Sequence, residues 1–209
     1  MKLTFNSLCD YVFIHFRRRR MRHFFNLFVP SPEVRVLDIG GTPQTWTCES
    51  QGHAPFSVTM INIRCDKEFE SSRFHFMLGD ATQLPFGDNA FDIVFSNSVI
   101  EHVGSWERQL AFAQEARRVA RKLWVQTPAR NFPIEAHLLA PFIQYLPKRV
   151  QHRIARWTPR GLLTPEVVHE IINEVRLLNY REIQELFPDC QILRERLFFL
   201  TKSYIAVRN

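Results

Sequence analysis

The stretch that decides the fold reads Val34-Arg35-Val36-Leu37-Asp38-Ile39-Gly40-Gly41. Its first six residues are mostly aliphatic and partly β-branched, which is typical of a strand that is buried on both faces of a parallel sheet. The two glycines that follow allow the backbone to come close to a ligand. We therefore expect a central strand over residues 34–39 that ends in a ligand-binding loop.

The rest of the chain alternates between strand-like and helix-like segments. Further short apolar runs predict strands over residues 56–62, 91–95, 123–127, 191–196 and 203–207. Capping signals predict helices after Ser105, after Thr164 and, with Glu182 as capping partner, after Asn179. Since the last two strands are close enough in sequence to pair antiparallel, the pattern predicts an open α/β sheet with an antiparallel strand and helices on both faces.

Composition excludes several classes of protein. The chain has 209 residues, of which 45% are hydrophobic, so it can bury a core and is not intrinsically disordered. It contains no long uncharged apolar run and no evident signal peptide. The four cysteines (Cys9, Cys48, Cys65, Cys190) form no CxxC pair, so we predict neither a disulfide framework nor a metal site. A cytoplasmic location is expected.

The net charge of +6 is concentrated in two segments. Residues 1–30 and residues 136–165 each sum to +5, which leaves −4 for the remainder. A nucleic-acid-binding domain usually has a broad basic surface, so no nucleic-acid partner is expected. Apolar residues at helical spacing make residues 1–30 a basic amphipathic helix, which either docks as a lid or touches an anionic membrane as a peripheral contact.

Polar side chains follow the successive strands. In an open α/β sheet the ligand lies at the carboxyl ends of the strands, so the loops there are candidate binding residues. Asn62 ends the second strand, where a polar group can bind ribose hydroxyls. Residues 79–81 are interpreted as the end of a third strand that precedes the strand over residues 91–95, and Asp80 there is an acid that can accept a hydrogen bond from the exocyclic amine of adenine. The complete set of candidate cofactor residues is Asp38, Gly40, Gly41, Thr42, Asn62, Asp80, Ala81, Ser96, Asn97 and Ser98.

On residues 36–41, 79–86 and 91–103 the sequence resembles the class I S-adenosylmethionine-dependent methyltransferases, in particular those that act on small molecules. The resemblance covers roughly residues 33–128 and implies a seven-stranded sheet of order 3-2-1-4-5-7-6, with strand 7 antiparallel. It also implies S-adenosyl-L-methionine as cofactor. On this basis residues 31–209 form the methyltransferase domain, with a substrate-cap insertion at about 129–163, and residues 1–30 form the helical segment before it.

The sequence departs from the family at two places. The family's glycine-rich loop continues with further glycines, whereas Thr42 and Pro43 follow Gly41 here. The family has an acid at the end of strand 2, whereas this chain has Asn62 there. The neutral amide of Asn62 binds a hydroxyl less strongly than a carboxylate does. Asp66 is a second candidate for this contact.

Three residues are candidates for catalysis. His102 follows the fourth strand, and Glu135 and His137 follow the fifth, so both loops are expected at the mouth of one pocket. An imidazole suits proton removal near pH 7, and a carboxylate can orient it or stabilise its charge. The alternative is that His102 only packs beside the cofactor and that Glu135 and His137 hold the insertion in place.

Two other functions stay open. A nucleotide-binding oxidoreductase has a related fold, but Thr42 and Thr45 interrupt the Gly-x-Gly-x-x-Gly pattern that seats a pyrophosphate. A non-catalytic adaptor could also use this scaffold. The predicted acceptor is a small, hydrophobic or anionic molecule, because the insertion is apolar and aromatic and is followed by a basic helix.

Overall fold

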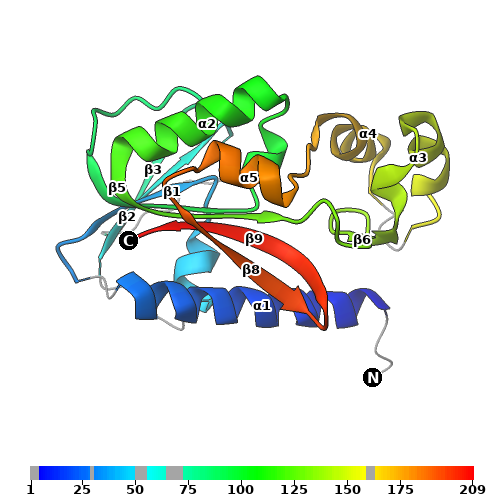
Figure 1. Ribbon diagram of the computed structural model, residues 1–209, viewed down its shortest axis with the longest axis horizontal. Coiled ribbons are helices and arrows are strands. Elements are labelled where there is room, and N and C mark those ends of the chain that lie inside the picture. The colour runs from blue at the N-terminus through cyan, green and yellow to red at the C-terminus, as the bar shows by residue number, and fades with distance from the viewer. Residues whose placement is uncertain (1–4, 29–30, 50–55, 65–72, 159–162) are drawn as a thin grey trace.

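The computed structural model describes residues 5–28, 31–49, 56–64, 73–158 and 163–209 (Figure 1). For residues 5–13 and 48–49 it describes the backbone only. The second ribose candidate, Asp66, and the side chains of Cys9, Cys48 and Cys65 therefore lie outside the described residues. Cys190 is a free thiol, and burial raises its pKa to about 12.

A seven-stranded sheet of order β3-β2-β1-β4-β5-β9-β8 forms the centre of the molecule. The first five strands in sequence pair in parallel, and β9 is antiparallel to both β5 and β8. The predicted order 3-2-1-4-5-7-6 is confirmed, because β8 and β9 are its strands 6 and 7. The bounds are β1 Arg35–Ile39, β2 Ser57–Asn62, β3 Phe74–Leu78, β4 Phe91–Asn97, β5 Ala120–Pro128, β8 Gln191–Leu197 and β9 Leu200–Arg208.

The helices begin where their capping residues predict. Ser105 accepts a hydrogen bond from Arg108 N, Thr164 accepts one from Val167 N, and Asn179 forms a complete capping box with Glu182. The α-helices are α1 Phe5–Phe28, α2 Trp106–Val119, α3 Lys148–Ala155, α4 Pro165–Glu174 and α5 Tyr180–Leu186. The short helices are the π-helix η1 Thr45–Glu49 and the 3₁₀-helices η2 Ile100–His102 and η3 Ile143–Tyr145.

Each face of the sheet carries its own core. On one face, α2 and α5 bury Phe112, Ala116 and Leu186 against β1, β4 and β5. On the other face lies α1 (Figure 1), whose Met21, Phe24 and Phe28 pack with residues of the sheet and with Trp46 of η1. The helix expected within residues 1–30 is therefore present, and its second half belongs to the core of the sheet.

Arg20 fixes α1 to both halves of the sheet. Its side chain is buried and pairs with Glu195 of β8, with Nη2 2.9 Å from Oε2. Its Nη1 donates to Asn97 Oδ1 and, at 2.7 Å, to Gln126 Oε1, so it also reaches the carboxyl ends of β4 and β5. A buried guanidinium with this many acceptors holds one orientation, and α1 is held with it.

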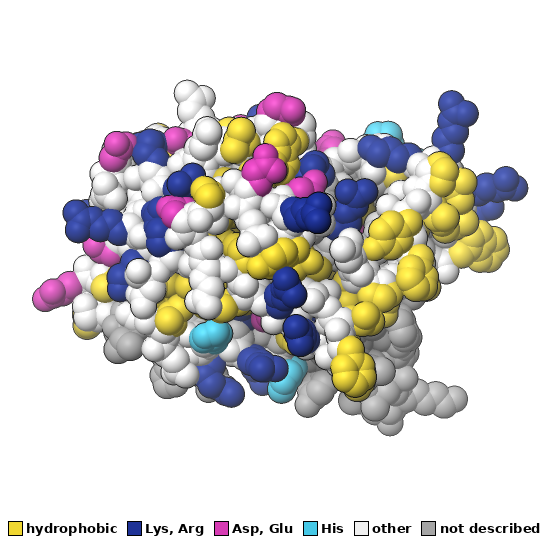
Figure 2. Space-filling model, viewed as in Figure 1, with side chains coloured by type: hydrophobic (Ala, Val, Ile, Leu, Met, Phe, Trp, Pro, Cys, Tyr) yellow, Lys and Arg dark blue, Asp and Glu magenta, His cyan; other side chains and the backbone are white. Residues whose placement is uncertain are grey.

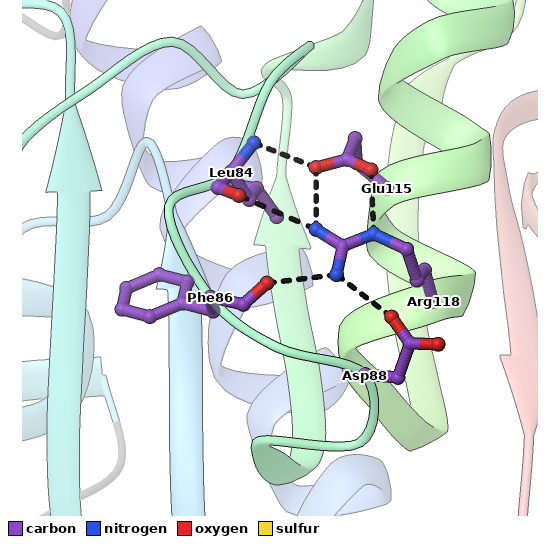
Figure 3. Close-up of polar contacts among 5 residues, drawn as sticks. All are labelled: Leu84, Phe86, Asp88, Glu115 and Arg118. Carbon is purple, nitrogen blue, oxygen red and sulfur yellow. Dashed lines mark hydrogen bonds and ion pairs between the residues drawn. The ribbon is translucent and has the colours of Figure 1, made fainter.

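The long loop after β3 is anchored on α2. Arg118 donates to the carbonyl of Phe86 at 2.7 Å and of Leu84 at 3.3 Å, and to Asp88 Oδ1 at 3.0 Å (Figure 3). Glu115 binds the same guanidinium and accepts from Leu84 N at 2.7 Å. This network gives a loop without regular structure a defined path, and the loop carries Asp80.

The insertion after β5 forms a small cap with α4. It contains the hairpin of β6 (Ile134–Glu135) and β7 (Ala140–Pro141), followed by η3 and α3. The cap has a core of its own, made of Leu138, Ala140, Ile143, Ala155 and Ile172. It lies beyond the end of β5 (Figure 1), and hydrophobic and basic side chains gather over this part of the surface (Figure 2).

None of the described helices is both long enough and apolar enough to span a lipid bilayer.

Candidate active site

The loop after β1 is shaped by its two glycines. Gly40 has φ +74°, and a Cβ there would lie 2.5 Å from Val99 Cγ2. A Cβ on Gly41 would fall within 2 Å of the Asp38 carboxylate, at 1.7 Å from Oδ2. Both positions therefore require glycine, one for its backbone conformation and both for lack of space. The Asp38 carboxylate is buried beneath the loop and accepts from Trp46 Nε1 at 2.7 Å.

The ends of β2 and β3 lie next to this loop. Asn62 Nδ2 donates to the carbonyl of Gly41 at 3.0 Å, and Gly40 N donates to the carbonyl of Ile61 at 2.8 Å. Gly79 N donates to the carbonyl of Asn62 at 2.9 Å. The first three candidate binding loops thus meet at one edge, as expected, and Asn62 uses its amide nitrogen to hold the glycine loop.

Asp80 is held by its own loop and by α2. Oδ1 accepts from Thr82 N and Thr82 Oγ1, both at 2.8 Å, and Oδ2 lies 2.9 Å from Arg108 Nη2. These hydrogen bonds, with that from Thr82 N the largest cause, lower the pKa of Asp80. The carboxylate is therefore ionised and partly exposed, with acceptor capacity left for a ligand. Ala81 beside it is buried.

The three candidate cofactor residues at the end of β4 differ in burial and in hydrogen-bond partner. Ser96 is fully buried, and its Oγ donates to the carbonyl of Ile39 at 3.1 Å. Asn97 accepts from Arg20. Ser98 has φ +58°, and its Oγ donates to Gln126 Oε1 at 3.0 Å. Ser96 thus joins β4 to β1, whereas Asn97 and Ser98 are partly exposed where the strands end.

The structure brings the three catalytic candidates together with Glu101. His137 Nδ1 lies 2.6 Å from Glu135 Oε1, and His137 Nε2 lies 3.1 Å from His102 Nε2. Ligand atoms of Glu101, His102 and His137 all lie within 4.8 Å of one another. We call Glu101, His102, Glu135 and His137 the His–Glu cluster. Because β4 and β5 are neighbours, η2 and the loop after β6 meet at the carboxyl edge.

Burial differs sharply within the cluster. Glu101 is completely buried, and burial raises its pKa to about 7 against the opposing effects of His137 and of a hydrogen bond from Thr127. Burial alone would raise the pKa of Glu135, but the hydrogen bond and the charge of His137 outweigh it and the pKa is lowered. His102 keeps an exposed edge; desolvation of the rest of its ring, followed by repulsion from His137, lowers its pKa to about 4.

Sequence reasoning missed two residues of this region. Glu101 lies within residues 91–103, which carry the family resemblance, and its place beside His102 is a signal that the sequence analysis did not use. Arg20 lies in a run of four arginines, and nothing in that run distinguishes the buried one from its neighbours. Its role depends on Glu195, which is 175 residues away, so no local signal could have found it.

Two hollows lie where the cap meets the rest of the chain. One of about 460 Å³ is lined by Arg64, which follows β2, and by Glu166, His169 and Glu174 of α4. Another, of about 300 Å³, lies within the cap and next to the His–Glu cluster. Its lining includes Glu135 and three cationic side chains, Arg130, Lys148 and Arg176.

Comparison with known proteins supports one family. Residues 54–123 match the family described as methyltransferase domain. No curated protein sequence matches the chain significantly.

Solved structures show the same fold. A magnesium protoporphyrin IX methyltransferase from Synechocystis, crystallised with bound SAH, superimposes with a TM-score of 0.57 at 16% identity over 100% of this chain and 90% of its own. A SAM-dependent methyltransferase from Methanosarcina mazei superimposes with a TM-score of 0.51 at 14% identity, over 85% of this chain and 92% of its own. A Rhodobacter sphaeroides protein provisionally assigned to the zinc-dependent alcohol dehydrogenases superimposes with a TM-score of 0.58 at 13% identity, over 90% of this chain and 88% of its own.

At these identities the solved structures show the fold alone. The strand order and the glycine loop after β1 agree with the match of residues 54–123 to a methyltransferase domain, and the chain has the fold of S-adenosylmethionine-dependent methyltransferases.

Proposed function

We propose that the chain transfers a methyl group from S-adenosyl-L-methionine to a nucleophilic atom of a small acceptor, which is bound between the sheet edge and the cap. The observation that carries this proposal is the His–Glu cluster, because it places titratable groups from two loops at the same edge as the glycine loop. This edge is where ligands bind in open α/β sheets.

The residues at the edge fit the cofactor. The loop of Gly40, Gly41 and Thr42 exposes backbone, and Asn62 Oδ1 can accept from a ribose hydroxyl while Nδ2 stays on Gly41. Asp80 would accept from the adenine amine, and Ala81 would pack beside the ring. Asn97 and Ser98 would border the methionine part, while the buried Asp38 and Ser96 would shape the loop from below.

The chain's own residues would handle the acceptor. When bound, the cofactor supplies a methyl group on a positively charged sulfur, so alignment accounts for much of the rate. Glu135 holds His137 through Nδ1, and His137 in turn fixes the ring of His102. The exposed edge of His102 would face the acceptor, and an imidazole there would accept the proton of a hydroxyl or ammonium group.

The cap supports an anionic acceptor with an apolar part. Arg130, Lys148 and Arg176 line the inner hollow, and guanidinium groups bind carboxylates and phosphates in fixed geometry. The cap also exposes large apolar side chains, which would contact the rest of such a molecule: Phe142, Tyr145, Leu146, Val150 and Trp157.

Calorimetry tests the proposal against its two alternatives. We expect S-adenosyl-L-methionine to bind and nicotinamide dinucleotides not to bind. Binding of the dinucleotide would favour the oxidoreductase, and binding of neither would favour the adaptor.

Single alanine variants at His102, Glu135 and His137, assayed at saturating cofactor between about pH 6 and 9, test the cluster. If all three keep the turnover and pH profile of the wild type, the cluster takes no part in the reaction.

Membrane contact by residues 1–30 remains a proposal in a restricted form. Phe16, Met21, Phe24 and Phe28 are buried in the molecule and are not available to lipid. The exposed arginines of the same helix are Arg17, Arg18, Arg19 and Arg22. Contact with a membrane would therefore be electrostatic and sensitive to salt.

Flotation with anionic vesicles tests this contact. Flotation should be lost when these four arginines are changed to Gln, and equal flotation of the wild type and the variant would contradict membrane contact. A cytoplasmic location stays a prediction.

A further inference from the structure

The three ligand atoms at the centre of the His–Glu cluster are arranged like the donors of a metal site. The Nε2 atoms of His102 and His137 face each other at 3.1 Å, and a carboxylate oxygen of Glu101 lies within 4.8 Å of both. In a tetrahedral zinc site with metal–nitrogen bonds of 2.0–2.1 Å, neighbouring nitrogens are about 3.3 Å apart. The two imidazoles are therefore close to the spacing that one ion would impose.

Hydrogen bonding within the cluster directs a lone pair to the same point. Glu135 Oε1 accepts from His137 Nδ1 at 2.6 Å, and Oε2 accepts from the backbone of His137 and Leu138 at 2.9 and 2.7 Å. A proton on Nδ1 leaves Nε2 of a neutral His137 as an acceptor, aimed at another imidazole nitrogen. A histidine oriented from behind by a carboxylate is the common arrangement around protein-bound metal ions.

The buried carboxylate of Glu101 is a second observation, independent of the two histidines, that points to a bound ion. Its side chain is completely buried, and Oε2 accepts from Thr127 Oγ1 at 3.0 Å, but no described group gives Oε1 a hydrogen bond. A buried carboxylate oxygen without a hydrogen bond is costly. An ion between Oε1 and the imidazoles would satisfy it.

We propose that Glu101, His102 and His137 bind one divalent transition-metal ion such as Zn²⁺, and that Glu135 positions His137 for it. Two imidazoles and one carboxylate are an established donor set for catalytic zinc, with a fourth position open. His102 lies at the exposed side of the cluster, so that position would face the cap. No cysteine motif pointed to this site.

The inference deepens the proposed function and its catalytic part rests on it. With an ion bound, both Nε2 lone pairs are used as ligands, so the ion replaces His102 in activating the acceptor. An oxygen of the acceptor would occupy the open position and lose its proton to water. The ion would orient this oxygen and lower its pKa. Binding of the metal itself does not depend on methyl transfer and can be measured without cofactor.

Cobalt(II) is the probe, because its visible absorption reports the ligands. We expect the untagged full-length chain to bind one Co²⁺ in equilibrium dialysis, with visible bands that Zn²⁺ displaces. His102→Ala, His137→Ala and Glu101→Gln should each lose these bands. Glu135→Gln should weaken affinity by about 10- to 100-fold, as expected for a group that orients a ligand.

The controls separate this site from adventitious binding and from failure of the fold. His152→Ala changes a histidine that stacks near His169 in the cap, with ring centroids 5.4 Å apart, and should leave the bands unchanged. Thermal unfolding of each variant shows whether it folds. Unchanged bands in folded His137→Ala, a thiolate charge-transfer band, or no stoichiometric binding would each overturn the proposal. Cofactor affinity of the metal-free chain tests the proposed function separately.

Discussion

Asp80 is the acid whose removal most directly tests the adenine site. Its carboxylate is ionised and held by Thr82 and Arg108. Asp80→Ala should weaken S-adenosyl-L-methionine binding by about 1–2 kcal/mol, roughly tenfold, because a hydrogen bond to a charged group is lost. Calorimetry measures this loss. Arg108→Ala removes the ion pair but keeps the carboxylate and should have a much smaller effect; equal losses would show that loop structure, not ligand contact, is affected.

Lys202 gives a pH dependence of stability. Burial, followed by the positive charge of Arg20, lowers its pKa to about 8, although Glu195 opposes this and Arg17 adds to it. The ordinary pKa is 10.5, so the unfolded chain binds more protons between pH 8 and 10.5 and this group makes stability rise with pH in that window.

Urea unfolding of the wild type and of Lys202→Met between about pH 7.5 and 9.5 measures this contribution. The wild type should gain more stability over the range than the variant. Lys148→Met, at an exposed lysine of α3, serves as control and should retain the wild-type slope. Parallel slopes for wild type and Lys202→Met would contradict the prediction.

At the scale of elements, the sequence predicted most of the sheet because its signals are local. Buried strands followed by polar loops are visible in short windows, and the caps at Ser105, Thr164 and Asn179 place three helices correctly. β3 was recognised only by the loop after it, because Phe74–Leu78 is partly exposed and contains His75. The packing of α1 on the sheet depends on distant partners and was not predictable from its helical spacing.

Phe24 tests whether α1 is part of the fold. It is fully buried and contacts the rings of Trp46, Phe95 and Trp124. Phe24→Ala should lower the free energy of unfolding by about 3–5 kcal/mol, the usual cost of such a cavity. Ile14→Ala, at an exposed position of the same helix, should change it by less than about 0.5 kcal/mol. Denaturant unfolding measures both, and a small effect at Phe24 would mean that α1 is dispensable.

Arg118 tests the loop between β3 and β4. Arg118→Ala removes five hydrogen bonds, three of them to this loop. The loop should become more mobile, and cofactor affinity should fall although Arg118 is not among the residues proposed to contact the cofactor. Hydrogen exchange of residues 79–90 and calorimetry measure the two effects. Asp88→Ala breaks only one of the bonds and should have the smaller effect; no change in exchange for Arg118→Ala would contradict this role.

For the whole molecule, ligand binding should appear as stability. A ligand that binds only the folded chain adds about 2.7 kcal/mol at 100 times its Kd, which raises Tm. S-adenosyl-L-methionine should therefore raise Tm and a nicotinamide dinucleotide should not, as differential scanning fluorimetry can show. No shift at saturation would contradict the cofactor assignment.

The cluster at the sheet edge was predicted as three residues from two loops. The position of Glu101 beside His102 was visible in the sequence, but the burial of its carboxylate depends on the packing.

The pairing of Arg20 with Glu195 also concerns how the chain is made. α1 leaves the ribosome well before Ile205 and Val207, yet its apolar face packs in one core with them. Contacts of such long sequence separation form slowly. During translation the helix therefore presents Met21, Phe24 and Phe28 to the surroundings until the hairpin of β8 and β9 is complete, and chains that stall before residue 191 should be substrates for chaperones.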